Sequence, residues 1–119
     1  MKKSIALIVL WGLAATLPPA AAAPVTGDHP SPYLALHADD PVGWQEWDLE
    51  SLARAREEGR LLFVSSGYFA CHWCHVMQRE SFRDPAIARI LRRLAVPVKV
   101  DRELQPALDD YLLDFTERT

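Results

Sequence analysis

The sequence predicts an α/β fold built around a parallel βαβ unit. Two short apolar runs, 61–64 (LLFV) and 96–100 (VPVKV), are separated by two segments with helical periodicity. This order predicts two strands joined by a helical crossover, which makes them parallel and right-handed. Run 61–64 has no polar alternation, so we expect both of its faces to be buried. With 119 residues, the chain has room for one domain.

Four helices accompany these strands, and a single helical turn precedes them. Trp44 and Trp47, three positions apart, would share a helix face. Pro97 has no backbone donor, so we expect it at the start of its strand or on an edge strand. Gly59 is expected to end the first helix, and Asp84 to cap the third. The predicted helical segments are 33–37, 48–58, 71–82, 84–94 and 103–117.

The first 22 residues have the layout of a secretory signal peptide. Lys2 and Lys3 form a basic start, an apolar stretch covers 5–17, and the small residues 20–22 fit a cleavage site. The apolar stretch is shorter than the ~20 residues of a membrane span, and an uncleaved N-terminal anchor is the alternative. We expect an exported domain, periplasmic or secreted, that comprises residues 23–119 and has no membrane span after cleavage.

Charge and cysteine content restrict the function further. The net charge is −3, and cleavage of the predicted signal peptide would remove two lysines and make the domain more acidic. Nucleic-acid binding needs a basic surface and is not expected. Cys71 and Cys74 are the only cysteines. A bridge between them closes a very small loop and adds little stability, so we expect the pair to serve reactivity or ligation.

The pentapeptide CHWCH, residues 71–75, has the properties of a redox dithiol. Strand 61–64 leads through a short loop to a helix that should begin at or just after Cys71. A helix N-terminus favours the Cys71 thiolate, and a protonated His72 would add to this effect. Cys74, one turn further, can attack a mixed disulfide formed on Cys71. Trp73 is either an exposed contact for a partner or a packing residue, and His75 is expected to hydrogen-bond near the helix start.

Two other chemistries use the same residues. The pattern C-x-x-C-H also attaches haem covalently, with His75 as proximal ligand and His29 or His37 as distal candidates. The buried strand upstream argues against haem, since small c-type cytochromes are mostly helical. Cys71, Cys74 and His75 could instead bind Cu(I) or zinc, although neighbours along one helical turn make a poor tetrahedron.

Three segments together resemble a known family. They are SPYLALHADDPVGWQEW (31–47), SSGYFACHWCHVMQRESF (65–82) and VKVDRE (98–103). They are similar to the DUF255 family, the thioredoxin-like domain of the spermatogenesis-associated protein 20 type, over about residues 31–111. The resemblance implies a thioredoxin-like fold with the C-x-x-C motif at a helix N-terminus. It also implies thiol–disulfide exchange with protein thiols or a redox partner protein, Cys71 as nucleophile, Cys74 as resolving thiol, and no cofactor.

The sequence departs from the thioredoxin pattern at one important position. Thioredoxins carry a buried carboxylate six residues before the first cysteine, where this chain has Ser65. A different proton acceptor for the second cysteine is therefore expected, and Glu80 and Asp101 are the candidates. The alternative for Glu80 is a solvated helix surface, and for Asp101 a turn at the end of its strand.

The resemblance also implies a segment with a cis-proline and a β-hairpin after the last helix. This sequence ends at Thr119, so we expect a thioredoxin-like domain without the C-terminal β-hairpin, either as a fragment of a longer reading frame or as a reduced domain. Such a sheet would be marginally stable alone or would be completed by a partner. The alternative function is a non-enzymatic binding module, whose dithiol holds Cu(I) or zinc or whose open edge docks a partner.

Overall fold

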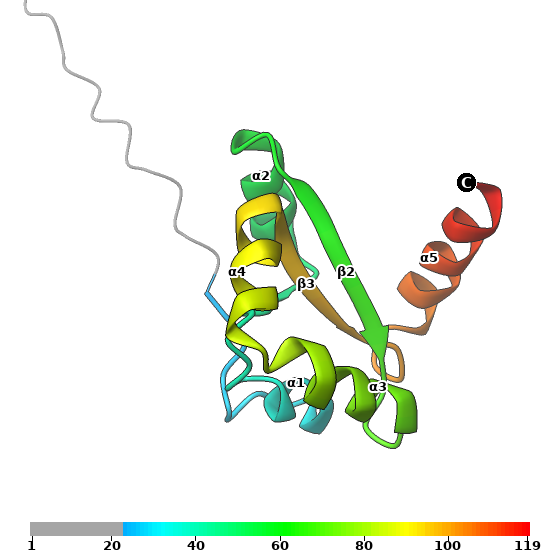
Figure 1. Cartoon of the computed structure of the whole chain (residues 1–119). Coiled ribbons are helices and arrows are strands. Elements are labelled where there is room, and N and C mark those ends of the chain that lie inside the picture. The colour runs from blue at the N-terminus through cyan, green and yellow to red at the C-terminus, as the bar shows by residue number, and fades with distance from the viewer. Residues whose placement is uncertain (1–22) are drawn as a thin grey trace, which may run out of the picture.

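The computed structural model describes residues 23–119, and the predicted signal peptide and its cleavage site lie outside the described residues. Within this range the α/β fold is confirmed, and each predicted helix and strand is present (Figure 1). The elements are α1 (Pro32–Leu36), β1 (Gln45–Glu46), α2 (Leu49–Glu57), β2 (Leu61–Gly67), α3 (His72–Met77), the π-helical η1 (Gln78–Phe82), α4 (Pro85–Leu94), β3 (Ala95–Asp101) and α5 (Pro106–Arg118).

Helices α1 and α4 begin at residues whose side chains satisfy free backbone donors. Ser31 Oγ accepts from the amide of Leu34 at the start of α1, and Asp84 accepts from the amide of Ala86 at the start of α4. A proline occupies the first turn of α1, α4 and α5, where the missing N–H costs nothing. Gly59, with a φ of +60°, follows α2 in the left-handed conformation that favours glycine. The predicted helix boundaries are therefore confirmed to within a few residues.

The sheet has three parallel strands in the order β1-β3-β2 among the described residues, with no β-hairpin. β2 and β3 pair in register from Leu61 opposite Ala95 to Gly67 opposite Asp101. The short β1, which the sequence did not predict, pairs with β3 at Val98 and Lys99. Strand rather than helix geometry separates the two tryptophans that flank β1. Trp44 packs on one face of the sheet and Trp47 on the other, so the prediction of a shared helix face was wrong.

Burial differs between β2 and β3 in a way that corrects two predictions. All seven residues of β3 are buried, because β3 is the central strand. Run 61–64 was expected to be buried on both faces, but Leu61 is 76% exposed and the next three residues are half-buried. β2 is an edge strand among the described residues, which explains its exposure. Pro97 lies within the central strand rather than at its start or on an edge strand, although β1 begins to pair only at Val98.

The two faces of the sheet carry different cores. The first, which we call the dithiol face, is covered by α1, η1 and α4, and its buried apolar residues include Tyr33, Trp44 and Phe82. The second, the aliphatic face, is covered by α2 and α5. Its core consists of Ala55, Val96, Val98 and Val100, with Leu62, Val64, Leu108 and Leu112 packed around it. Alternation along β3 directs every second side chain, including Lys99 and Asp101, to the dithiol face.

Candidate functional site

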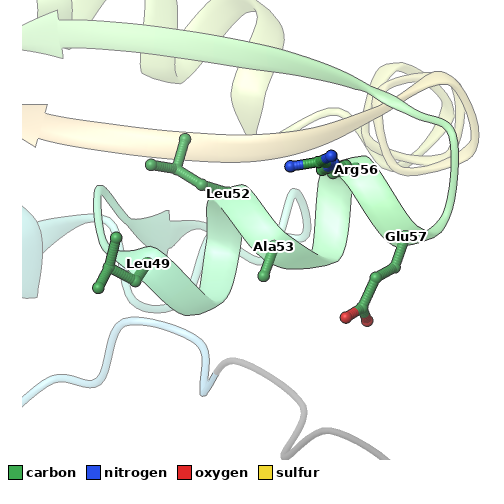
Figure 2. Close-up of a pocket in the computed structure, with 5 residues that line it drawn as sticks. All are labelled: Leu49, Leu52, Ala53, Arg56 and Glu57. Atoms are coloured by element: carbon green, nitrogen blue, oxygen red, sulfur yellow. The ribbon is translucent and has the colours of Figure 1, made fainter.

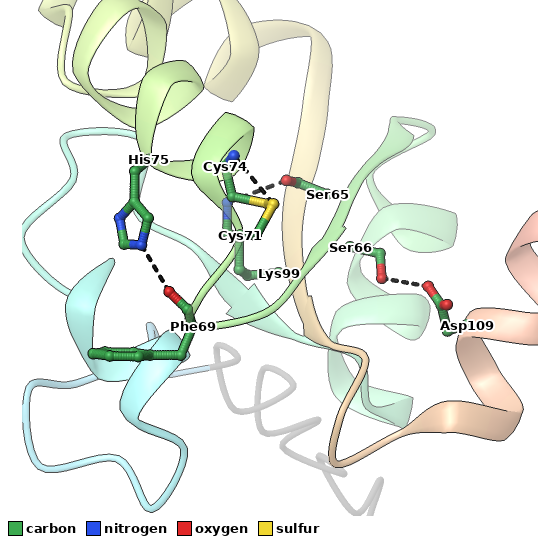
Figure 3. The surroundings of a disulfide bond; sticks show 8 residues. All are labelled: Ser65, Ser66, Phe69, Cys71, Cys74, His75, Lys99 and Asp109. Carbon is green, nitrogen blue, oxygen red and sulfur yellow. Dashed lines mark hydrogen bonds between the residues drawn. A yellow bond between two sulfur atoms is a disulfide. The ribbon is translucent and has the colours of Figure 1, made fainter.

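The dithiol lies where β2 leads into α3. β2 ends at Gly67, a short loop follows, and Cys71 is the N-cap of α3, as predicted. The Cys71 Sγ accepts a hydrogen bond from the backbone amide of Cys74 at 3.2 Å. The two cysteines form a disulfide with their Cα atoms 5.3 Å apart (Figure 3). Both side chains are half-buried, so the bridge lies at the surface with one side against the protein.

The three other residues of CHWCH lie around this bridge in different environments. Trp73 is 75% exposed, and the His72 ring, also exposed, lies edge-on to it at 5.1 Å between centroids. The His75 Nε2 is 2.7 Å from the carbonyl oxygen of Phe69, in the loop that precedes the dithiol (Figure 3). This contact holds the loop against α3, as expected for a hydrogen bond near the helix start.

The candidate ligands of the haem and metal alternatives have other partners in this structure. His29 Nε2 lies 2.8 Å from Glu46 Oε1, and the buried His37 is bonded to Asp40. His75 points to the Phe69 carbonyl, and the two sulfur atoms are bonded to each other. Among residues 23–119, no group of three or more His, Cys, Asp or Glu side chains is arranged to hold a metal ion.

The two predicted proton acceptors occupy unequal positions. Glu80 lies in η1 and is exposed to solvent. Asp101 is buried at the end of β3, where it accepts hydrogen bonds from the Ser31 hydroxyl at 2.5 Å and from the amide of Glu103 at 3.0 Å. These contacts correspond to the strand-end turn that was the alternative for Asp101. They also tie α1 to the end of the central strand, near the dithiol.

Lys99 is the residue that the sequence reasoning missed. It lies opposite Ser65 in the sheet, is only 1% exposed, and its Nζ is 3.1 Å from the Ser65 Oγ (Figure 3). The amine also lies over the rings of Trp44 and Phe82, at 4.4 and 4.5 Å from their centroids. A signal was present in VPVKVD. The three valines occupy alternate positions of one strand, so Lys99 had to face the opposite side of the sheet, where the dithiol lies.

Cys74 and Lys99 line the same open cavity of about 380 Å³. Its wall is formed by Phe63, Val64, Ser65, Ser66, Trp73, Cys74, Met77, Phe82 and Lys99. Burial lowers the pKa of Lys99 to about 7, against a smaller opposing effect of the Asp40 carboxylate. An amine with this pKa exchanges its proton near neutrality. The cavity beneath the bridge therefore holds a titrating amine next to Ser65, the residue that stands where thioredoxins have a carboxylate.

A buried polar network supports the dithiol face from below. Asp40 accepts hydrogen bonds from His37 Nδ1 at 2.6 Å, Trp44 Nε1 at 2.9 Å and Gln78 Nε2 at 2.9 Å. Gln78 also donates to the carbonyl of Leu36, which links η1 to α1. Burial is the largest effect on His37 and lowers its pKa, so the neutral ring donates to the carboxylate rather than forming an ion pair.

A second cavity lies far from this chemistry. It runs along α2 and is lined by Leu49, Leu52, Ala53, Arg56 and Glu57 (Figure 2). It brings together no buried polar group or nucleophile, so we do not regard it as a catalytic site. None of the helices in residues 23–119 has the length and apolarity needed to cross a bilayer.

Comparison with known proteins identifies the family. A family model described as "Protein of unknown function, DUF255" and named Thioredox_DsbH matches residues 26–119. Human spermatogenesis-associated protein 20 is 46% identical over 89 residues, which are 75% of this chain and 11% of that protein. An uncharacterized protein of Caenorhabditis elegans is 44% identical over 89 residues, covering 75% of this chain and 12% of its own length. The chain spans about an eighth or less of these relatives, and it belongs to the DUF255 family of thioredoxin-like proteins.

Proposed function

We propose that this domain is an exported thiol–disulfide oxidoreductase that acts on protein thiols and disulfides. The observation that carries the proposal is the position of Cys71 as the N-cap of α3, with an amide donor 3.2 Å from its sulfur. A backbone donor at a helix N-terminus stabilises negative charge on the sulfur and thereby favours the reactive thiolate. Membership of a thioredoxin-like family supports the same chemistry.

The exchange proceeds in two balanced steps. The Cys71 thiolate attacks one sulfur of a substrate disulfide, a bond forms between them, and the other substrate sulfur leaves as a thiolate. Cys74 then loses its proton and attacks the Cys71 sulfur, which closes the Cys71–Cys74 bridge and releases the first substrate sulfur. Two electrons pass from the dithiol to the substrate, and the two protons of the dithiol go to the substrate thiolates or to water. The reverse sequence oxidises a substrate dithiol.

The surroundings of the bridge fit a macromolecular substrate. Trp73, 75% exposed beside the half-buried sulfurs, offers a large apolar contact that a small thiol would not need. The exposed His72 adjoins it. We assign Trp73 to substrate contact and His75 to positioning of the loop that leads into the dithiol, through its bond to Phe69.

A thiolate titration of the reduced domain tests this function. Absorbance near 240 nm, followed against pH in Cys74→Ser, reports Cys71 alone. We expect a pKa well below the free-thiol value of about 8.5, and exchange with a model protein disulfide. The same variant should accumulate a mixed disulfide on Cys71, whereas Cys71→Ser should form none. An unshifted Cys71 pKa without exchange would contradict the proposal, and a Soret band in the visible spectrum would replace it with haem chemistry.

Export is a separate part of the proposal and rests on the N-terminal sequence alone. The basic start, apolar stretch and small residues before Ala23 support cleavage after Ala22. N-terminal sequencing of the protein recovered from the periplasm or medium of an expressing bacterial cell should begin at Ala23. A chain that retains Met1 and pellets with membranes would instead support an uncleaved anchor.

A further inference from the structure

One buried hydroxyl on the dithiol face has no hydrogen-bond partner. Tyr33, in α1, is only 1% exposed, yet its Oη contacts no donor or acceptor in the described structure. An unpaired buried hydroxyl costs free energy, and a partner that appears in another state of the protein would account for it. Neither the proposed exchange steps nor the Asp40 network gives this hydroxyl a role.

The Tyr33 hydroxyl lies near the Cys74 sulfur of the bridge. Gly67 ends β2 directly below the dithiol, and a Cβ atom at this position would lie 2.7 Å from the Cys74 Sγ. The same Cβ atom would also collide with the Tyr33 Oη. The Tyr33 Oη and the Cys74 Sγ therefore lie on either side of the space that a side chain at position 67 would fill. Glycine at this position leaves that space open, so the two atoms can approach each other.

Burial and the neighbouring carboxylates keep the Tyr33 hydroxyl protonated. Burial, and then the carboxylates of Asp101 and Asp40, raise the pKa of Tyr33 far above its ordinary value. His37 lies edge-on to the Tyr33 ring at 5.0 Å and is neutral at pH 7, and the Lys99 amine is 5.4 Å from the ring centroid. A phenol in these surroundings remains a hydrogen-bond donor over the whole pH range in which thiols titrate.

We propose that Tyr33 is a catalytic residue that donates a hydrogen bond to the Cys74 thiolate when the bridge opens. This inference rests on the proposed exchange function and adds the group that stabilises the resolving thiolate. In the disulfide, the Cys74 sulfur is a weak acceptor and the hydroxyl stays unpaired. On reduction, the same sulfur becomes a thiol that can lose its proton, and the thiolate is a strong acceptor for the waiting donor. Tyr33 thus favours the reduced dithiol over the disulfide.

Removal of the single oxygen tests the inference in two measurements. In a Cys71→Ser background, Cys74 is the only thiol that titrates. There, Tyr33→Phe should raise the Cys74 pKa by about one unit, which lowers the fraction of Cys74 thiolate about tenfold at pH values below that pKa. At pH values above the Cys74 pKa, where the reduced chain carries the Cys74 thiolate, Tyr33→Phe in the chain with both cysteines should shift the equilibrium with glutathione about tenfold toward the disulfide. That factor corresponds to a reduction potential about 30 mV more negative.

The control is Tyr111→Phe, which removes the same atom from a tyrosine of α5 that is 62% exposed, and it should change neither value. Urea unfolding of the oxidised Tyr33→Phe protein checks its fold, which should be at least as stable as the parent because the buried oxygen makes no hydrogen bond there. If that variant does not fold, the ¹³C shift of Tyr33 Cζ in the Cys71→Ser protein should follow the Cys74 titration. An unchanged Cys74 pKa, or a Cζ shift that ignores the titration, overturns the role of Tyr33. A normal Cys71 pKa overturns only the exchange function.

Discussion

The two faces of the sheet carry side chains of the same strands but differ in their chemistry. On the aliphatic face, Val96, Val98 and Val100 pack against Ala55 of α2, and the buried carboxylate of Asp109 in α5 is paired with Arg102 and accepts a hydrogen bond from the Ser66 hydroxyl. On the dithiol face, the alternate residues of the same strand include a buried lysine and a buried carboxylate. Buried polar groups destabilise a fold unless they are paired, so their concentration on one face indicates that this face serves a reaction.

The largest expected effect is the removal of the buried charge of Lys99, the one lysine in residues 23–119. The pKa of this amine falls from 10.5 in the unfolded chain to about 7 in the fold. Between these values the unfolded chain binds more protons, so the stability of the oxidised protein should rise with pH, by about 4 kcal/mol between pH 7 and pH 10. Lys99→Met should be more stable at pH 7 and should lose this rise.

Urea unfolding at a series of pH values, on the oxidised proteins so that no thiol titrates, measures both chains. The pKa itself can be read from the ¹³Cε shift of the single lysine in the domain without its signal peptide. An equal rise with pH in Lys99→Met, or a lysine pKa near 10.5, would contradict the assignment of a buried, titrating amine to the dithiol face.

The next effect concerns the carboxylate that organises the dithiol face. Asp40→Asn places an amide group among the three donors of His37, Trp44 and Gln78, so at least one buried donor loses its acceptor. We expect a loss of about 3 kcal/mol in the free energy of unfolding at pH 7. Burial by itself would raise the pKa of Asp40, but the three hydrogen bonds together outweigh it and lower the pKa. Its stabilisation is therefore complete above the unfolded pKa of about 4 and is lost as the pH falls through the lower folded value.

The matched control is Asp39→Asn, the exposed neighbour, which should change stability by less than about 0.5 kcal/mol. Chemical unfolding of both variants at pH 7 and at pH 3 decides the matter. If the two variants are equally stable at pH 7, the network does not hold the dithiol face together.

The sequence predicted the skeleton of the fold and the position of the dithiol. Helix caps such as Ser31 and Asp84, and the proline that follows each, are local signals, and they fixed the helix starts. β1 was missed because two residues cannot show a period, and the exposure of β2 was missed because burial of a strand depends on its neighbours in the sheet. The role of Tyr33 could not be predicted from the sequence, because the proximity of its hydroxyl to Cys74 arises only where α1 packs against the end of β2.

The aliphatic face offers the opposite test, a change in stability without a change in chemistry. Val98 is fully buried in the central strand, and Val98→Ala removes two methyl groups from the core. We expect a loss of about 2 kcal/mol in the free energy of unfolding. The Cys71 pKa and the equilibrium with glutathione should stay as in the parent. A shift in either value would show that the two faces are coupled through β3 and are not separate in function.

The smallest effect on stability should come from the surface of the dithiol face. Trp73 is 75% exposed and its removal in Trp73→Ala should change the free energy of unfolding by less than about 0.5 kcal/mol. Exchange with a small disulfide should also keep its rate, because both sulfurs and their hydrogen bonds remain. Exchange with a protein disulfide should slow about tenfold if the indole is a substrate contact. Leu104→Ala, which alters another exposed apolar side chain, after β3, serves as the control. Equal slowing for small and protein substrates would show that Trp73 affects the reactivity of the dithiol itself. The exposed surface of the site would then contribute to the chemistry and not only to substrate recognition.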